Sequence, residues 1–189
     1  MSKYTQPIID LVYAIAKGSK KVRNILTPFV GLIFFAIIVL FIWLGIITDR
    51  ILNLPRIIPA PFGMIFSIFF IIVGLVLMLW SVICFLKVKG TPVPINPPPV
   101  LVTYGFYKYV RNPMLTGVFT VMLGIGFFNN SCSFIFFYLP VYIFLNYIEL
   151  KLIEEPELEK RLGKAYVEYK KITPMFFPFL KAGRTKELK

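Results

Sequence analysis

Four long apolar runs, separated by short polar or proline-rich segments, dominate the pattern of hydrophobic positions along the chain. The runs cover residues 28–47, 62–86, 112–128 and 133–152. A helix that crosses the hydrocarbon layer of a bilayer, roughly 30 Å thick, needs about 20 predominantly apolar residues. The pattern therefore predicts an all-α membrane protein with about four transmembrane helices, in which the third and fourth spans form a helical hairpin.

Amphipathic segments flank these runs at both ends of the chain. Within residues 1–27, apolar side chains recur at helical spacing, namely at Ile8, Leu11, Val12 and Ile15. Beyond Pro156, a charged segment repeats apolar and aromatic side chains at four- and three-residue steps, namely at Leu158, Leu162, Tyr166 and Tyr169. Such one-sided spacing is typical of helices that lie on a membrane surface. We therefore expect an amphipathic N-terminal segment and a C-terminal amphipathic helix.

A proline-rich segment, residues 87–100, separates the second run from the third. It carries five prolines, at positions 92, 94, 97, 98 and 99. Proline lacks the backbone N–H of a helix and favours extended polyproline-like backbone. The segment is expected to form an extended strap, which either covers a site or serves as a spacer.

Basic residues lie almost entirely on one side of the predicted membrane. Of the 21 Lys and Arg residues, only Arg50 and Arg56 fall in the loop between the first two spans. Because cytoplasmic loops carry the excess of Lys and Arg, both termini of this multi-pass protein are expected in the cytoplasm. The net charge of +12 then indicates contact with anionic lipid headgroups. It does not indicate a nucleic-acid partner, because no basic face stands apart from the membrane flanks.

Composition supports a membrane location and argues against a metal site. The chain is 58% hydrophobic and 16% charged, whereas about a quarter of an ordinary soluble domain is charged. It has no histidine, which removes the commonest zinc ligand and the usual general base near neutral pH. Cys84 and Cys132, the two cysteines, fall near opposite ends of the predicted spans, which argues against a disulfide between them.

Two polar clusters carry the candidate chemistry. The first precedes and enters the third run and contains Gly105, Tyr107, Arg111, Pro113 and Gly117. The second follows the fourth run and contains Glu154, Glu155, Leu158, Gly163, Tyr166 and Tyr169. Pro113 suits the first turn of a helix, whose free N–H groups attract a carboxylate or a phosphate. Alternatively, the arginine and tyrosines of the first cluster anchor a helix end among the lipid headgroups.

In their order and spacing, the two clusters resemble the isoprenylcysteine carboxyl methyltransferase and phospholipid methyltransferase superfamily of integral membrane enzymes. The resemblance covers roughly residues 100–180. The chain departs from the family pattern at Asn112, where the family often has histidine, and at Leu115, where it often has tyrosine. Asparagine can form hydrogen bonds but cannot shuttle a proton near neutral pH. The departures therefore concern the acceptor more than the cofactor.

The resemblance implies methyl transfer from S-adenosylmethionine to a lipophilic acceptor, either an isoprenylcysteine-like carboxylate or a phospholipid headgroup. Residues 28–86 then form the first two transmembrane helices, and residues 87–189 form a methyltransferase-like catalytic region. The implied catalytic residues are Arg111, Glu154 and Glu155. The implied cofactor-binding residues are Leu101, Tyr107, Arg111, Asn112, Gly124, Gly126, Glu154 and Glu155.

Other interpretations remain open at this point. Asn112 and Leu115 are compatible with a non-catalytic membrane protein of the same fold that has a lipid-binding or assembly role. A small transporter fits less well, because the chain shows no internal repeat. Glu154 and Glu155 would also suit the N-terminus of a surface helix. Gly117, Thr120 and Gly124 would also serve as a small-residue stripe for helix packing.

Overall fold

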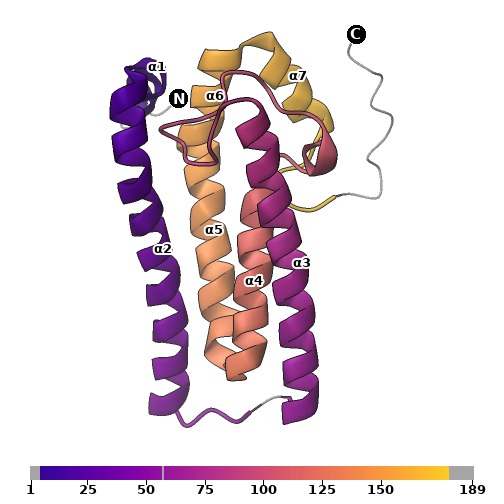
Figure 1. Ribbon diagram of the computed structural model, residues 1–189. Coiled ribbons are helices and arrows are strands. Elements are labelled where there is room, and N and C mark those ends of the chain that lie inside the picture. Colours follow the sequence, from indigo (N-terminus) through magenta and orange to yellow (C-terminus); the bar gives the residue numbers. More distant parts are fainter. Residues whose placement is uncertain (1–4, 57, 179–189) are drawn as a thin grey trace.

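The computed structural model describes residues 5–56 and 58–178, and this part of the chain is built from helices and loops without a strand (Figure 1). The longer helices are α1 (Gln6–Lys17), α2 (Lys20–Ile51), α3 (Ala60–Lys87), α4 (Pro113–Asn129) and α5 (Leu139–Glu149). The shorter elements are the 3₁₀-helix η1 (Gly105–Lys108), the π-helical segments η2 (Phe134–Tyr138) and η3 (Leu150–Glu154), and the helices α6 (Glu155–Leu162) and α7 (Lys164–Ile172). The predicted all-helical class is confirmed.

Three helices of the described chain are long and apolar enough to cross a membrane. They cover Lys20–Ile51, Pro61–Lys87 and Phe134–Leu162, while the apolar helix Pro113–Asn129 is shorter. The first begins earlier than the apolar run at residue 28, because α2 continues through Pro28. Large apolar side chains are exposed along α2 and α3, as on a surface that faces lipid.

Close contact between α3 and α4 depends on two glycines that face each other. A Cβ atom added at Gly74 would lie 2.6 Å from the Gly117 carbonyl oxygen, and one added at Gly117 would lie 2.7 Å from that of Gly74. Small residues at a membrane helix interface let two backbones approach closely. Gly117 therefore acts in helix packing, which was one of the two interpretations of the small-residue stripe.

The far end of the bundle is fixed by a capped turn between α4 and η2. The chain leaves α4 through Asn130, which has a left-handed backbone. Asp49 at the end of α2 accepts hydrogen bonds from the Ser131 hydroxyl and, at 2.9 Å, from the Ser133 backbone N–H. From this turn, η2 and α5 return beside α4 (Figure 1). Phe119 and Met122 of α4, Phe134 and Tyr142 form part of the core between them.

The opposite end of the bundle carries α1, α6, α7 and the proline-rich segment (Figure 1). The helix formed by η2 and α5 continues through η3 into α6, and it ends at Gly163, whose φ of 64° is a left-handed conformation suited to glycine. The predicted C-terminal surface helix is therefore two helices, α6 and α7. Residues 173–178 then return toward the start of α4, and residues 179–189 lie outside the described residues.

The proline-rich segment is not extended, and this expectation was wrong. Thr91 and Asn96 close a compact loop, because both the backbone N–H and the hydroxyl of Thr91 donate to the Asn96 carbonyl at 2.9 Å. The Asn96 N–H in turn donates to the Val93 carbonyl at 2.9 Å. Proline spacing alone does not reveal these bonds, because the residues between the prolines supply them.

Candidate functional site

A pocket lies where the proline-rich loop, the start of α4, and helices α6 and α7 meet. The loop contributes Thr91, Pro92, Val93, Pro94, Pro97, Pro98, Val100, Leu101 and Val102 to its lining. The helices and the segments between them contribute Phe85, Tyr107, Arg111, Asn112, Glu154, Leu158, Arg161, Leu162, Tyr166 and Tyr169. The two polar clusters of the sequence are thereby brought together at one end of an apolar bundle.

Arg111 is held in place by both its backbone and its side chain. Its N–H donates to the Pro174 carbonyl at 2.8 Å, and the next N–H, of Asn112, donates to the Met175 carbonyl at 3.1 Å. Its guanidinium donates from Nη1 to Glu155 Oε1 at 2.5 Å, with only 10% of the side chain exposed. The segment after α7 therefore fixes the backbone from which this arginine enters the pocket.

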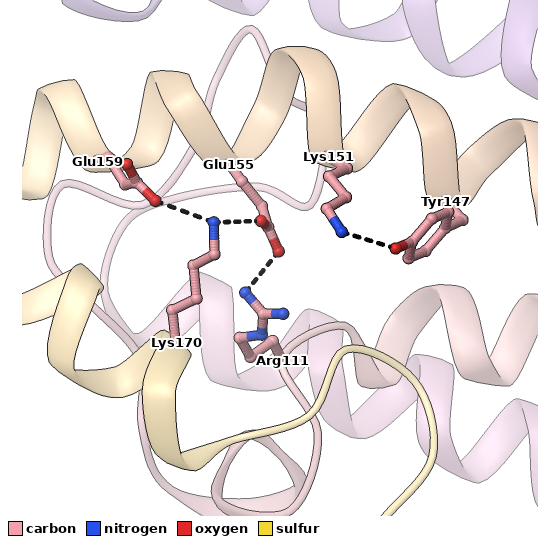
Figure 2. A network of polar contacts seen from close by, with 6 residues as sticks. All are labelled: Arg111, Tyr147, Lys151, Glu155, Glu159 and Lys170. Carbon is pink, nitrogen blue, oxygen red and sulfur yellow. Dashed lines mark hydrogen bonds and ion pairs between the residues drawn. The ribbon is translucent and has the colours of Figure 1, made fainter. Parts of the chain in front are cut away.

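Glu155 is a buried carboxylate whose two oxygens both have cationic partners. Arg111 contacts Oε1, and Lys170 of α7 contacts Oε2 at 2.5 Å (Figure 2). The Glu155 side chain is 3% exposed, and Lys170 also reaches Glu159 at 2.9 Å. Burial opposes the charge on Lys170, but its hydrogen bonds to the two carboxylates outweigh this effect and raise its pKa. Glu155 therefore orients Arg111 from behind and does not itself line the pocket.

Glu154, its neighbour in sequence, has a different environment. It lines the pocket, and its carboxylate has no hydrogen bond or ion pair with any residue that the structure describes. A carboxylate without a partner in a partly enclosed site is costly unless a cation or a hydrogen-bond donor joins it. Of the two predicted glutamates, Glu154 is the one that is free to bind a ligand.

Arg161 lines the pocket but was not predicted from the sequence as a site residue. Its Nε donates to Glu157 Oε1 at 2.8 Å, and the two side chains are 8% and 3% exposed. Two arginine nitrogens at this site, Arg161 Nη2 and Arg111 Nε, are buried without a hydrogen-bond partner. The spacing of Glu157 and Arg161, four residues apart on a helix, is the signal that would have indicated this pair.

Three tyrosines form an aromatic wall beside these charges. The Tyr169 hydroxyl donates to the Tyr107 carbonyl at 2.5 Å, which ties α7 to η1. Burial raises the pKa of Tyr107, Tyr166 and Tyr169, so the three phenols stay protonated near neutral pH. They can donate hydrogen bonds there but cannot act as bases.

The predicted site residues divide into three groups. The structure brings Leu101, Tyr107, Arg111, Asn112 and Glu154 together around the pocket. Glu155 lies behind it, against Arg111.

The third group, Gly124 and Gly126, lies elsewhere. Gly124 faces Ile71 and Ser67 of α3, and Gly126 faces Phe134 and Ile135 of η2. The two glycines thus serve two different packing surfaces, and neither lines the pocket. Within the described residues, no group of three or more His, Cys, Asp or Glu side chains could hold a metal ion.

Comparison with known proteins identifies the family. Searches of curated proteins and of solved structures gave no significant match. A model of the phospholipid methyltransferase family matches residues 62–165, which is more than half of the chain. The match includes the first polar cluster and the second as far as Gly163, and it extends further toward the N-terminus to cover nearly all of α3. The chain belongs to the phospholipid methyltransferase family.

Proposed function

We propose that the protein is an integral membrane methyltransferase that uses S-adenosylmethionine and acts on a lipophilic acceptor. The observation that carries the proposal is the pocket itself. An unpaired carboxylate, Glu154, lines it together with two guanidinium groups, Arg111 and Arg161, each of which has one unpaired nitrogen. This set of groups lies at one end of an apolar helical bundle in a chain of a methyltransferase family.

The polar groups of the pocket match those of the cofactor. S-adenosylmethionine carries an ammonium and a carboxylate at one end, and its sulfonium supplies an activated methyl group when it is bound. Glu154 offers a partner for the cationic end, and the unpaired nitrogens of Arg111 and Arg161 offer partners for the carboxylate. Tyr107, Tyr166 and the prolines of the loop offer flat apolar surfaces for the adenosine part.

Proton transfer places a limit on the acceptor. The three buried tyrosines stay protonated, and Glu155 is engaged by two cations, so Glu154 is the one unpaired acid of the pocket lining. A carboxylate acceptor needs no base, whereas an ammonium acceptor must first lose a proton. An acceptor that arrives deprotonated therefore makes the smaller demand on this pocket.

The surroundings of the pocket favour an amphiphilic acceptor. The helices below it expose apolar side chains, so a tail can remain in the bilayer while the head reaches the pocket. Each methylene of such a tail that stays out of water contributes about 0.8 kcal/mol. The acceptor that we propose has an acyl or prenyl tail and is methylated at headgroup depth.

In the membrane, we propose four spans, in which α4 and the helix formed by η2 and α5 make a hairpin. The distribution of Lys and Arg supports a cytoplasmic location for both termini and for the pocket. A cysteine placed at Asn130 should react with an impermeant thiol reagent added from outside, and one placed at Lys186 should not. The opposite pattern would show that the orientation is wrong.

A second candidate function is a non-catalytic lipid-binding or assembly role. Asn112 favours it, because this pocket residue cannot move a proton near neutral pH. The two functions are separated by two measurements on the purified protein, namely binding of S-adenosylhomocysteine and transfer of radiolabel from S-adenosylmethionine to added lipid extract. We expect binding, and label in the organic phase. Binding without any transfer would favour the non-catalytic role, and absence of binding would exclude both the cofactor and the enzyme.

A further inference from the structure

Arg161 is the one residue of the pocket lining whose side chain is bonded both to α6 and to the proline-rich loop. Its Nε donates to Glu157 on α6, and its Nη1 donates to the Pro98 carbonyl of the loop at 2.7 Å. Its remaining nitrogen, Nη2, is buried and has no partner. A guanidinium has five N–H groups in a rigid planar fork, so the first two bonds fix the direction of the third nitrogen.

The loop that Arg161 holds has its own internal structure. Thr91 and Asn96 close it through backbone and hydroxyl bonds, and Gly90 packs directly on Pro98 at its base. Bonds within the loop and its prolines keep its shape when its outer contacts change. The loop is therefore one structural unit.

Within the part of the chain that the structure describes, two side-chain bonds join this loop to the helices around it. One is the Arg161 bond to Pro98, and the other is the Asn96 amide, which donates to Asn24 of α2 at 3.3 Å. The Asn24 bond lies outside the pocket lining, whereas Arg161 belongs to it. A ligand that binds Arg161 inside the pocket can thus affect the bond between Arg161 and the loop directly.

We propose that Arg161 is a binding and positioning residue that couples an anionic ligand group to closure of the proline-rich loop. The anion bonds to Nη2 and satisfies the unpaired nitrogen, while Nη1 keeps the Pro98 carbonyl over the pocket. The closed loop then excludes water from the bound ligand. This inference rests on the proposed function, because the anionic group that we assign is the carboxylate of the cofactor.

The coupling follows from the geometry of the guanidinium. Nε, Nη1 and Nη2 lie in one plane, so an anion that fixes Nη2 also fixes the position of Nη1. A lysine at this position keeps the charge opposite Glu157, but it offers a single ammonium and cannot bond in three fixed directions. Arg161→Lys therefore separates the charge of the residue from its bridging role.

The test combines ligand affinity with the accessibility of the loop. In a full-length chain with Cys84→Ala and Cys132→Ala, Ile95→Cys places a thiol on the loop at a residue that does not line the pocket. S-adenosylhomocysteine is the probe. It should slow the reaction of this thiol with a maleimide at least severalfold when Arg161 is present. With Arg161→Lys, the affinity should fall by roughly tenfold to a hundredfold, as expected for loss of a charge-assisted contact, and the protection of the thiol should disappear.

Two further variants control for misfolding. Asn24→Ala breaks the other bond of the loop, so it should speed thiol reaction in the free protein but leave protection by S-adenosylhomocysteine intact. Glu157→Gln removes the anchor of Arg161 and keeps the guanidinium, so, in protein that thermal unfolding shows to be folded, it should weaken protection by S-adenosylhomocysteine.

The outcomes distinguish the two levels of the proposal. If the unaltered chain does not bind S-adenosylhomocysteine, the proposed function fails, and the coupling through Arg161 fails with it. If the unaltered chain binds, but Arg161→Lys or Glu157→Gln binds and protects the loop equally well, only the coupling through Arg161 is wrong.

Discussion

The same substitution should affect different properties of the protein at the adjacent acids Glu154 and Glu155. Glu155 is buried between Arg111 and Lys170, whereas Glu154 lines the pocket without a described partner. Glu155→Gln removes a buried negative charge and leaves Arg111 uncompensated. Glu154→Gln removes an acid that has no hydrogen-bond or ion-pair partner among the described residues. The first change should mainly lower stability, and the second should mainly lower cofactor affinity.

The expected magnitudes follow from the burial of each partner. Arg111 and Glu155 are 10% and 3% exposed, and breaking such a buried pair from one side costs about 3–5 kcal/mol. Lys170 is 34% exposed, so solvent screens its share and it adds little to this cost. For a chain of this size, the loss corresponds to a fall in apparent Tm on the order of 10 °C. Glu154→Gln should leave the Tm within a few degrees.

The assay is thermal unfolding in detergent, paired with binding of S-adenosylhomocysteine to each variant. Glu154→Gln should bind roughly tenfold to a hundredfold more weakly, because it loses one charge-assisted contact. The reasoning would be refuted if both variants lost stability equally, or if Glu154→Gln bound the ligand as tightly as the unaltered chain. Glu159→Gln, which changes the outer partner of Lys170, is a matched control that should have little effect on either measurement.

Three further predictions address the scaffold. Gly74→Ala should destabilise the protein by a few kcal/mol, because its new Cβ would lie 2.6 Å from the Gly117 carbonyl oxygen, while Gly31→Ala, with open space around it, should be neutral in the same thermal unfolding assay. Asp49→Asn should lower the Tm by several degrees, since it weakens the charge-assisted cap of the α4–η2 turn. Burial raises the pKa of Tyr169, so the stability that its neutral hydroxyl contributes should persist below about pH 10 and decline above it. Tyr169→Phe should reduce this decline when Tm is measured across pH 8–11.

The long apolar helices were predictable from the sequence, because the length of an apolar run determines them. The runs at residues 62–86 and 112–128 correspond closely to α3 and α4. The run at residue 28 gave too late a start, because polar residues of α2 precede it in the same helix. Pro28, the first residue of that run, does not start the helix, because a helix can lose one backbone bond and continue.

The end of the helix that η2 and α5 begin was harder to predict. Pro156 suggested the start of a separate helix, yet the chain continues from α5 through the π-helical segment η3 into α6. Proline lacks the N–H that would bond back by one turn, and a local change in helix type can accommodate this loss. The change in winding also decides which side of the helix Glu154 and Glu155 face, and sequence spacing does not reveal it.

The site was only partly predictable, because most of its contacts join distant parts of the chain. The family resemblance predicted Arg111 and Glu155 as site residues, but their ion pair joins residues 44 apart in the sequence and depends on how the segment before α4 meets α6. Arg161 was missed, since its bond to Pro98 exists only when the proline-rich loop is compact. Gly124 follows the family pattern, but it packs against α3 at a position along α4 that is too far from the pocket to line it.

The two buried ion pairs of the site are better explained by a ligand than by stability. Replacing a buried pair such as Arg161–Glu157 with apolar residues of similar volume is often neutral or stabilising, so burial alone does not favour it. Here each pair also leaves an arginine nitrogen, Arg161 Nη2 or Arg111 Nε, without a partner, which adds a desolvation cost in the free protein. An anion that reaches both nitrogens removes this cost only when it is bound. In the proposed function, a zwitterionic ligand supplies an anion to the two arginine nitrogens and a cation to Glu154. The arrangement of charges at the end of this apolar bundle therefore favours a ligand that carries both signs, as the amino-acid end of S-adenosylmethionine does.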